Sequence, residues 1–152
     1  MFSTVRIECT VRDEKGVKSV SGTGFIFDFF RNPEDNVPVI VCNKHVIEGS
    51  IHGVFVFNSA GEDGRPLFGQ PISCNFDEFI KTWIFHPDHG IDLAIMPIGG
   101  LLNHLLQTGK RVYYTSISSS TIPQKEEWEK YHVLEDILVI GYPNALMDTV
   151  NN

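Results

Sequence analysis

The sequence predicts an all-β protein whose core is an antiparallel six-stranded β-barrel. Apolar and polar residues alternate with a period of two in several short segments, as they do in strands that bury one face. Clusters of Gly, Pro, Asn and Asp separate these segments at short intervals, as turns do between consecutive strands. Six strands joined in this way favour closure into a barrel, because closure removes the exposed edges of a sheet.

The first strand is expected over residues 3–12 and has the clearest alternation. Val5, Ile7, Cys9 and Val11 share one face, and charged or hydroxyl side chains occupy the other. This pattern is typical of an antiparallel strand with one face in a core.

Five further apolar segments complete the expected barrel, at residues 17–30, 37–43, 52–60, 79–87 and 92–98. Gly22 and Gly24 interrupt the first of these segments, and glycine inside a strand marks a bulge, a bend or a close approach of the backbone. Aromatic residues at strand spacing are expected in the core, namely Phe55, Phe57, Trp83 and Phe85.

The pattern changes after residue 99. Leucines at helical spacing predict a short helix that ends at Gly109, with one apolar face formed by Leu101, Leu102, Leu105 and Leu106. A polar, proline-containing linker follows, and then a strongly apolar strand over 133–142. We therefore expect a barrel over 1–99, a linker with short helical segments over 100–132, and a single strand within 133–152.

The composition and net charge argue against some classes of partner and favour one cellular compartment. The 152 residues carry a net charge of −7, and without a basic stripe this argues against nucleic-acid and anionic-membrane partners. Three well-separated cysteines, Cys9, Cys42 and Cys74, have no paired spacing and are expected to be reduced, packed thiols. The charged first residues do not have the pattern expected of a signal peptide, and the sequence contains no apolar run of about 20 residues. The sequence thus predicts a cytoplasmic location and no cofactor.

His45 and Asp92 are the two candidate functional residues. His45 follows a buried strand and is either a satisfied core histidine or a placed base. Asp92 is flanked by Ile91 and Leu93, where it is either a hydrated turn aspartate or a dehydrated carboxylate that orients an imidazole. The second interpretation predicts that the Asp92 carboxylate lies about 2.6–3.2 Å from the His45 ring.

Four segments together resemble a known family. "SGTGFIF", "VIVCNKHVIEG", "GIDLAIMPI" and "VIGYPN" occur in the order and approximate spacing of the trypsin-like (chymotrypsin-fold) serine peptidases, and look most like bacterial intracellular trypsin-like peptidase domains. The resemblance implies that His45 is the general base and that Asp92, 47 residues later (92 − 45), orients it. It also implies a double barrel, with 133–152 as the first strand of a truncated second barrel.

The sequence departs from the family at the nucleophile. The family's serine lies in a Gly-x-Ser-Gly setting well after a "GYP" segment, and no such setting occurs before Asn152. Ser21 lies upstream of His45, and residues 118–120 lack the flanking glycines of an oxyanion hole. The cysteines all fall within the first barrel.

We therefore expect the N-terminal portion of a serine endopeptidase that acts on polypeptide substrates. It would need the C-terminal half of the same fold and would be inactive alone. The alternative is a catalytically dead protease-fold binding module.

A metal site is the competing hypothesis for the segment "HPDHGID". His86, His89 and Asp92 could supply ligands to zinc. However, Pro87 and Gly90 predict a tight loop that does not align three ligands, and Asp92 is already assigned to His45. We expect no metal.

Overall fold

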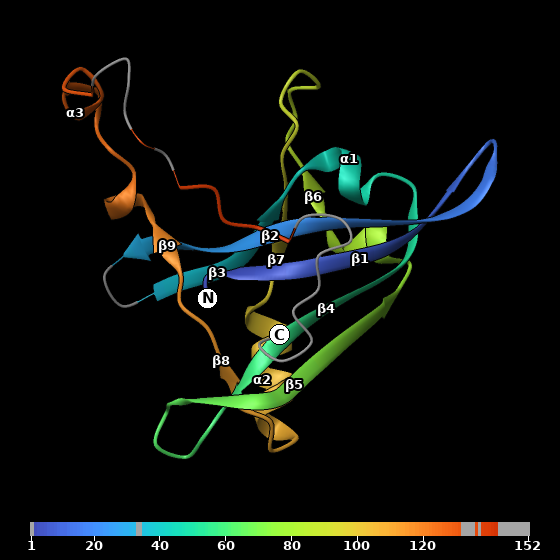
Figure 1. The fold of residues 1–152 in the computed structure, drawn as a ribbon, viewed down its shortest axis with the longest axis horizontal. Helices are drawn as coiled ribbons and strands as arrows, with labels where there is room; N and C mark the ends of the chain where they lie inside the picture. Colours follow the sequence, from blue (N-terminus) through green and yellow to red (C-terminus); the bar gives the residue numbers. More distant parts are fainter. Residues whose placement is uncertain (1, 33–34, 132–135, 137, 143–152) are drawn as a thin grey trace.

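The computed structural model describes residues 2–32, 35–131, 136 and 138–142. It is 49% strand and 18% helix, and its strands form a single sheet (Figure 1). The strands are β1 (Thr4–Asp13), β2 (Gly16–Asn32), β3 (Asp35–Cys42), β4 (Ser50–Ala60), β5 (Pro66–Asp77), β6 (Ile84–Phe85), β7 (Ala94–Pro97), β8 (Val112–Tyr113) and β9 (Ile117–Ser118). The helices are α1 (Lys44–Ile47), α2 (Gly99–Gln107) and α3 (Lys125–Trp128), with 3-10 turns η1 (Phe79–Thr82) and η2 (Ser119–Thr121). Within the described ranges, no helix has the length and apolar character needed to cross a membrane.

The sheet is antiparallel along its main path but is not closed. Its strands run in the order β5-β4-β1-β2-β3-β7-β6, while β8 pairs with β4 and β9 pairs in parallel with β2. The all-β prediction is confirmed at this level. The expected closure is not seen, because the outer strands β5 and β6 do not pair within the described residues. With only two residues, β6 offers few backbone groups for such pairing.

The structure contains one strand that was not predicted, and one predicted strand is divided. The prediction omitted β5, because glycine and proline interrupt its sequence and most of its side chains are exposed. The segment 79–87, expected to be one strand, divides into the 3-10 turn η1 and the two-residue β6.

The chain after residue 99 contributes to the same sheet. The expected helix is present as α2, with Leu105 buried and Leu106 56% exposed. β8 and β9 then attach to β4 and β2. The Ser116 hydroxyl donates a hydrogen bond to the buried carboxylate of Asp28 on β2. Burial, and secondarily the charge of Asp28, raises the pKa of the nearby Tyr114 hydroxyl.

The apolar strand expected over 133–142 lies partly outside the described residues, which here comprise 136 and 138–142. No strand is assigned to this described part. Leu138 and Val139 are each 84% exposed. The backbone N–H of Tyr142 donates to Thr23 Oγ1 on β2 at 2.8 Å, so the end of the segment contacts the sheet.

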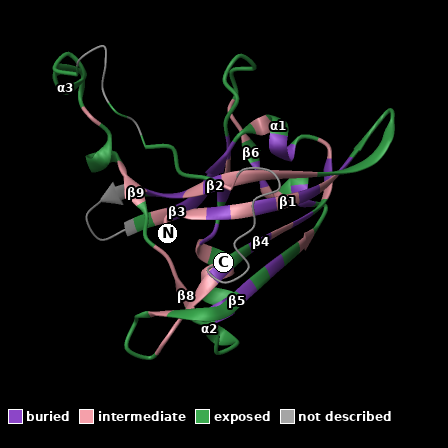
Figure 2. Ribbon diagram, viewed as in Figure 1, coloured by how far each residue is buried: buried purple, intermediate pink, exposed green. Residues whose placement is uncertain are grey.

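The core follows the alternation predicted for the first strand. The inward side chains of β1 are at most 6% exposed (Figure 2). Of the expected core aromatics, Phe55, Phe57 and Trp83 are buried, and Phe85 packs against the core while remaining partly exposed.

Gly53 on β4 makes room for the aromatic part of this core. A Cβ atom at position 53 would lie 2.0 Å from Phe79 Cδ1. Phe79 is fully buried and packs at 5.6 Å, centroid to centroid, against Phe76 and against Trp83. The absence of a side chain at Gly53 therefore allows η1 to close over the core.

We predict that Gly53→Ala lowers the free energy of unfolding by about 1–3 kcal/mol, because the added methyl displaces the ring of Phe79. Gly100→Ala is the matched control, since Gly100 lies in α2 with no atom within 4 Å of its added Cβ. It should be neutral or stabilising by up to about 1 kcal/mol. Urea denaturation followed by circular dichroism measures both, and equal stability of the two variants would contradict the packing argument.

Candidate functional site

The pairing of β3 with β7 brings the two candidate residues together. Cys42, the last residue of β3, lies opposite Ala94, the first residue of β7. His45 follows the end of β3 by three residues, and Asp92 precedes β7 by two. In Figure 1, α1 and the loop between β6 and β7 accordingly lie next to each other at one end of the sheet.

Two apolar residues of the turn that carries His45 pack into the core and hold the turn in place. Val46 and Ile47 of α1 are buried. Val46 lies against Gly22 of β2, where an added Cβ would be 2.7 Å from Val46 Cγ1. The glycine of the "SGTGF" segment thus permits α1 to lie close to the sheet, and this contact fixes the backbone of His45.

The predicted contact between His45 and Asp92 is present. His45 Nδ1 lies 2.6 Å from Asp92 Oδ2, and the His45 backbone N–H donates to Asp92 Oδ1 at 3.0 Å. The side-chain amide of Asn43 donates to Asp92 Oδ2 at 3.2 Å and to the Asp92 carbonyl at 3.0 Å. Asn43 was not among the residues predicted from the sequence, because only the folded turn points its amide toward Asp92.

These hydrogen bonds determine the protonation of the pair, which we call the dyad. The pKa of Asp92 is lowered, first by the hydrogen bond from the His45 side chain and next by the His45 backbone N–H. An ionised carboxylate only accepts hydrogen bonds, so Nδ1 of His45 carries the proton. In the neutral form of this imidazole the lone pair lies on Nε2, which is the atom able to accept a proton.

The dyad is more exposed than the sequence suggested. The side chains of His45 and Asp92 are 70% and 48% exposed. The expectation of a dehydrated carboxylate was therefore wrong. Its apolar neighbours do not cover it, since Ile91 and Leu93 are themselves 38% and 42% exposed.

No nucleophile accompanies the dyad within the described residues. Neither a hydroxyl nor a thiol there is hydrogen-bonded to His45. Ser21 lies next to Gly22 on β2, and because successive residues of a strand face opposite sides, it faces away from α1. It lines a shallow depression with Arg6 and Glu8.

The cysteines do not offer a substitute nucleophile. All three are unpaired and buried, as expected. Burial raises the pKa of Cys9 to about 12 and the pKa of Cys42 and of Cys74 to about 11. These thiols remain protonated near neutral pH, and a protonated thiol is a weak nucleophile.

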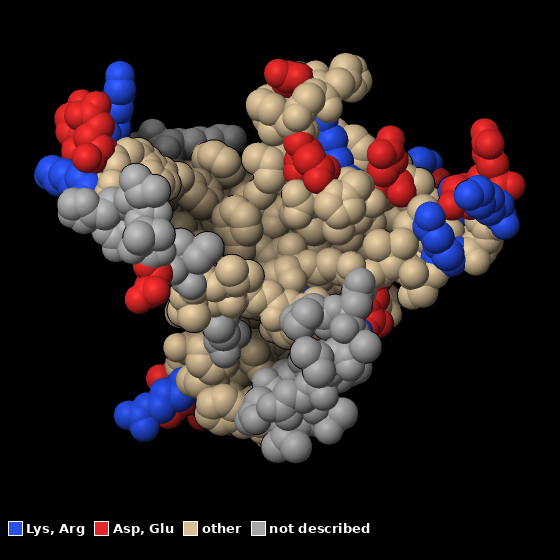
Figure 3. All heavy atoms as spheres, turned by 45° about the horizontal axis from the view of Figure 1, so that its top comes forward, with Lys and Arg blue, Asp and Glu red and all other residues tan. Residues whose placement is uncertain are grey.

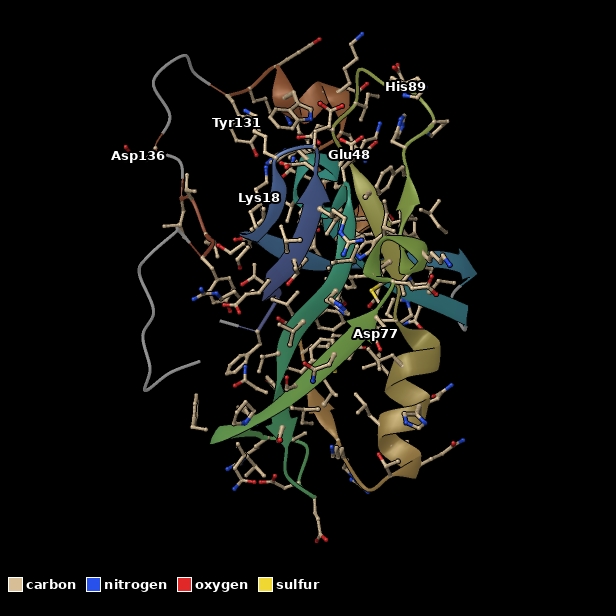
Figure 4. All side chains as sticks on the ribbon, turned by 90° about the vertical axis from the view of Figure 1, so that its right-hand side faces the viewer. Lys18, Glu48, Asp77, His89, Tyr131 and Asp136 are labelled. Atoms are coloured by element: carbon tan, nitrogen blue, oxygen red, sulfur yellow. The ribbon has the colours of Figure 1, made fainter. Side chains whose placement is uncertain are left out.

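The three residues considered as metal ligands do not converge. His86 Nδ1 accepts a hydrogen bond from the Asp88 backbone N–H at 3.1 Å, and Asp92 is engaged by His45. His89 is exposed in the projecting loop that leads to Asp92 (Figure 4). Across the described part of the chain, no group of three or more His, Cys, Asp or Glu side chains is placed to hold a metal ion.

A second histidine–aspartate pair was not predicted from the sequence. His52 on β4 lies opposite Asp77 on β5, and His52 Nδ1 is 2.8 Å from Asp77 Oδ1. Their side chains are 59% and 89% exposed, and the labelled Asp77 is visible on β5 in Figure 4. Only the register of β4 against β5 brings them together, so no motif could have indicated the pair.

An apolar groove of about 660 Å³ adjoins the dyad. Its lining comes from the outward faces of β2, β3, β6 and β7 and from the chain at β9 and beyond. Leu93, the residue after Asp92, lines it. Phe29, Ile84 and Ile122, also in the lining, are 47%, 58% and 48% exposed. Figure 3 shows charged side chains gathered at the projecting turns and α3, with largely uncharged surface between them.

Comparison with known proteins gives no family assignment. No family model matches the sequence, and no curated protein or solved structure matches the chain.

We predict that His45→Ala raises the pKa of Asp92 toward the ordinary aspartate value of about 3.9, because the largest cause of its lowering is removed. In the wild type, the folded pKa lies below the unfolded value. The stabilisation from this carboxylate is therefore fully present above about pH 4 and is lost as the pH falls through the folded pKa.

Titration of the Asp92 carboxyl carbon by NMR measures both effects. His89→Ala serves as the control, because it removes a histidine from the same loop without touching the dyad. An identical Asp92 titration in the wild type and in His45→Ala would contradict the assignment.

Proposed function

We propose that this chain is the N-terminal portion of a trypsin-like serine endopeptidase. In this proposal His45 is the general base and Asp92 orients it. The observation that carries the proposal is the contact between them, in which one carboxylate holds both the ring Nδ1 and the backbone N–H of the same histidine. This arrangement fixes the tautomer and the orientation of the imidazole, which is the task of the carboxylate in a Ser-His-Asp triad.

In the proposed reaction His45 carries a proton from the serine hydroxyl to the leaving amine. Nε2 takes the proton of a serine hydroxyl as its oxygen attacks the carbonyl carbon of a peptide bond, and the resulting imidazolium is stabilised by Asp92. The same proton then passes to the leaving amine as the C–N bond breaks. The serine and the oxyanion hole come from a C-terminal half outside these 152 residues.

The proposal also assigns parts of the chain and the apolar groove to the double-barrel arrangement of these peptidases. In this proposal the open sheet of residues 2–32 and 35–99 corresponds to the family's first barrel and residues 100–131 to the connection, whereas the second-barrel strand expected within 133–152 falls mostly outside the described residues. The apolar groove is the surface for the C-terminal half. It adjoins the dyad, and covering its exposed aromatic and aliphatic side chains would contribute about 25 cal/mol per Å² of buried apolar surface. The unpaired, buried cysteines favour a reducing compartment, the cytoplasm.

A protease-fold binding module is the second candidate function. It is supported by the absence of a nucleophile near His45 among the described residues and by the apolar groove, which alone suffices for a docking role. In that case the dyad has no catalytic role.

We predict that the purified 152-residue chain hydrolyses no peptide and is not labelled by a fluorophosphonate probe. Acyl transfer has no first step without an activated nucleophile. In the intact gene product, or after co-expression with the downstream coding sequence, the probe should label a serine outside residues 1–152. His45→Ala should abolish peptide hydrolysis, and Asp92→Asn should reduce it by about 10⁴-fold.

The control for these variants is His52→Ala, which disrupts the other histidine–aspartate pair and should leave hydrolysis unchanged. An intact gene product that is not labelled, or whose hydrolysis is unaffected by His45→Ala, would favour the binding module.

We also predict that Ile84→Asp weakens association with a separately expressed C-terminal half by at least about tenfold, because it places a charge in the apolar groove. Val17→Asp is the matched control. Val17 is 60% exposed, close to the 58% of Ile84, but lies outside the groove at the β1–β2 turn. Isothermal titration calorimetry compares the two variants, and equal affinities would exclude the groove as the interface.

A further inference from the structure

A second cavity lies at the opposite end of β3 from the dyad. Its volume is about 900 Å³, and its walls come from the start of β3, the turn between β4 and β5, α2, and residues 110–114. Asn36 and Pro38 line it near the start of β3, whereas His45 follows the end of that strand. Figure 1 accordingly shows α1 and α2 at opposite ends of the sheet. We call this site the α2 cavity.

The charged side chains that line the α2 cavity are two cations. Among the residues that the structure describes, Lys110 and Arg111 line it and no acidic residue does. Neither cation forms a salt bridge with any described residue. Two adjacent cations in a chain with a net charge of −7 form a local positive site, and such a site attracts an anion.

The other lining residues are suited to a ligand that has an apolar group and a few groups that form hydrogen bonds. Leu102 and Leu106 of α2 supply an apolar wall, and Leu106 is 56% exposed although it faces a concavity. Tyr113 and Tyr114 add aromatic side chains, and Asn103 adds an amide. Binding sites for small molecules typically have this mixture of apolar walls and a few polar groups, in volumes of about 300–1,000 Å³.

We propose that the α2 cavity binds a small organic anion, a carboxylate, sulfonate or phosphate attached to an apolar group. The anionic group is held by Lys110 and Arg111 through charge-assisted hydrogen bonds. The apolar group covers Leu102 and Leu106 between α2 and the tyrosines. This site is separate from the dyad and does not depend on peptidase activity.

Fluorescence titration with anilinonaphthalene sulfonate tests the proposal, because this probe joins a sulfonate to an apolar aromatic body. The wild-type chain should bind it saturably. The double variant Lys110→Gln, Arg111→Gln should weaken binding by at least about tenfold. Added salt should weaken binding to the wild type but have little effect on the double variant.

Two control variants test whether the probe binds in the α2 cavity and not elsewhere on the chain. Lys125→Gln with Lys130→Gln removes the same charge from exposed positions at α3 and should bind like the wild type. Ile84→Asp alters the apolar groove and should also leave binding unchanged. Circular dichroism verifies that each variant is folded. Absence of saturable binding by the wild type, equal binding by the Lys110/Arg111 variant, or loss of binding in Ile84→Asp would overturn the proposal.

Discussion

The antiparallel register between β3 and β7 positions the dyad and the apolar groove, and it places the strand that borders the α2 cavity. Four residue pairs join the two strands, from Val39 opposite Pro97 to Cys42 opposite Ala94. Because side chains alternate along each strand, this register sends Ile40 and Met96 into the main core and leaves Val41 and Ile95 facing the apolar groove. Just beyond the Cys42–Ala94 pair lies the dyad, and the opposite end of β3 borders the α2 cavity. A shift of one residue in the β3–β7 pairing would disrupt the dyad, the apolar groove and the α2 cavity.

Glycines make the close packing around this register possible. Gly22 admits α1 against β2, and Gly53 admits the ring of Phe79. At Gly24, an added Cβ would lie 2.5 Å from Ile40 Cγ2 on the neighbouring strand. Each glycine removes one side chain from a crowded core position, so the backbone of one element can approach the side chains of another. The two glycines of the "SGTGF" segment are thus explained by close packing alone, without reference to the resemblance.

Asp28 and Asp92 differ in their exposure and in the hydrogen bonds that their carboxylates accept. Asp28 is 7% exposed and accepts one hydrogen bond, from Ser116, while its Oδ1 has no partner among the described residues. Asp92 is half-exposed and receives hydrogen bonds from both the side chain and the backbone of His45 and from Asn43. The dyad is therefore arranged by hydrogen bonding and not by burial. A partner that covers it would exclude water and strengthen the electrostatic interaction between His45 and Asp92.

The sequence by itself determined the local features of this protein: the strand alternation of β1, the position of α2 and the buried aromatics. These follow from periodicity and from turn residues. The contact between His45 and Asp92 was also expected, but from the order of the four motifs and the apolar neighbours of Asp92, and it forms only through the pairing of β3 with β7. The sequence did not predict β5, whose exposed side chains and internal glycine weaken the strand pattern. The open sheet, the exposure of the dyad, the role of Asn43, the His52–Asp77 pair and both cavities were decided only by the tertiary structure. The physical reason is that each depends on strand register or on the packing of segments far apart in the chain, and local residue patterns do not encode either.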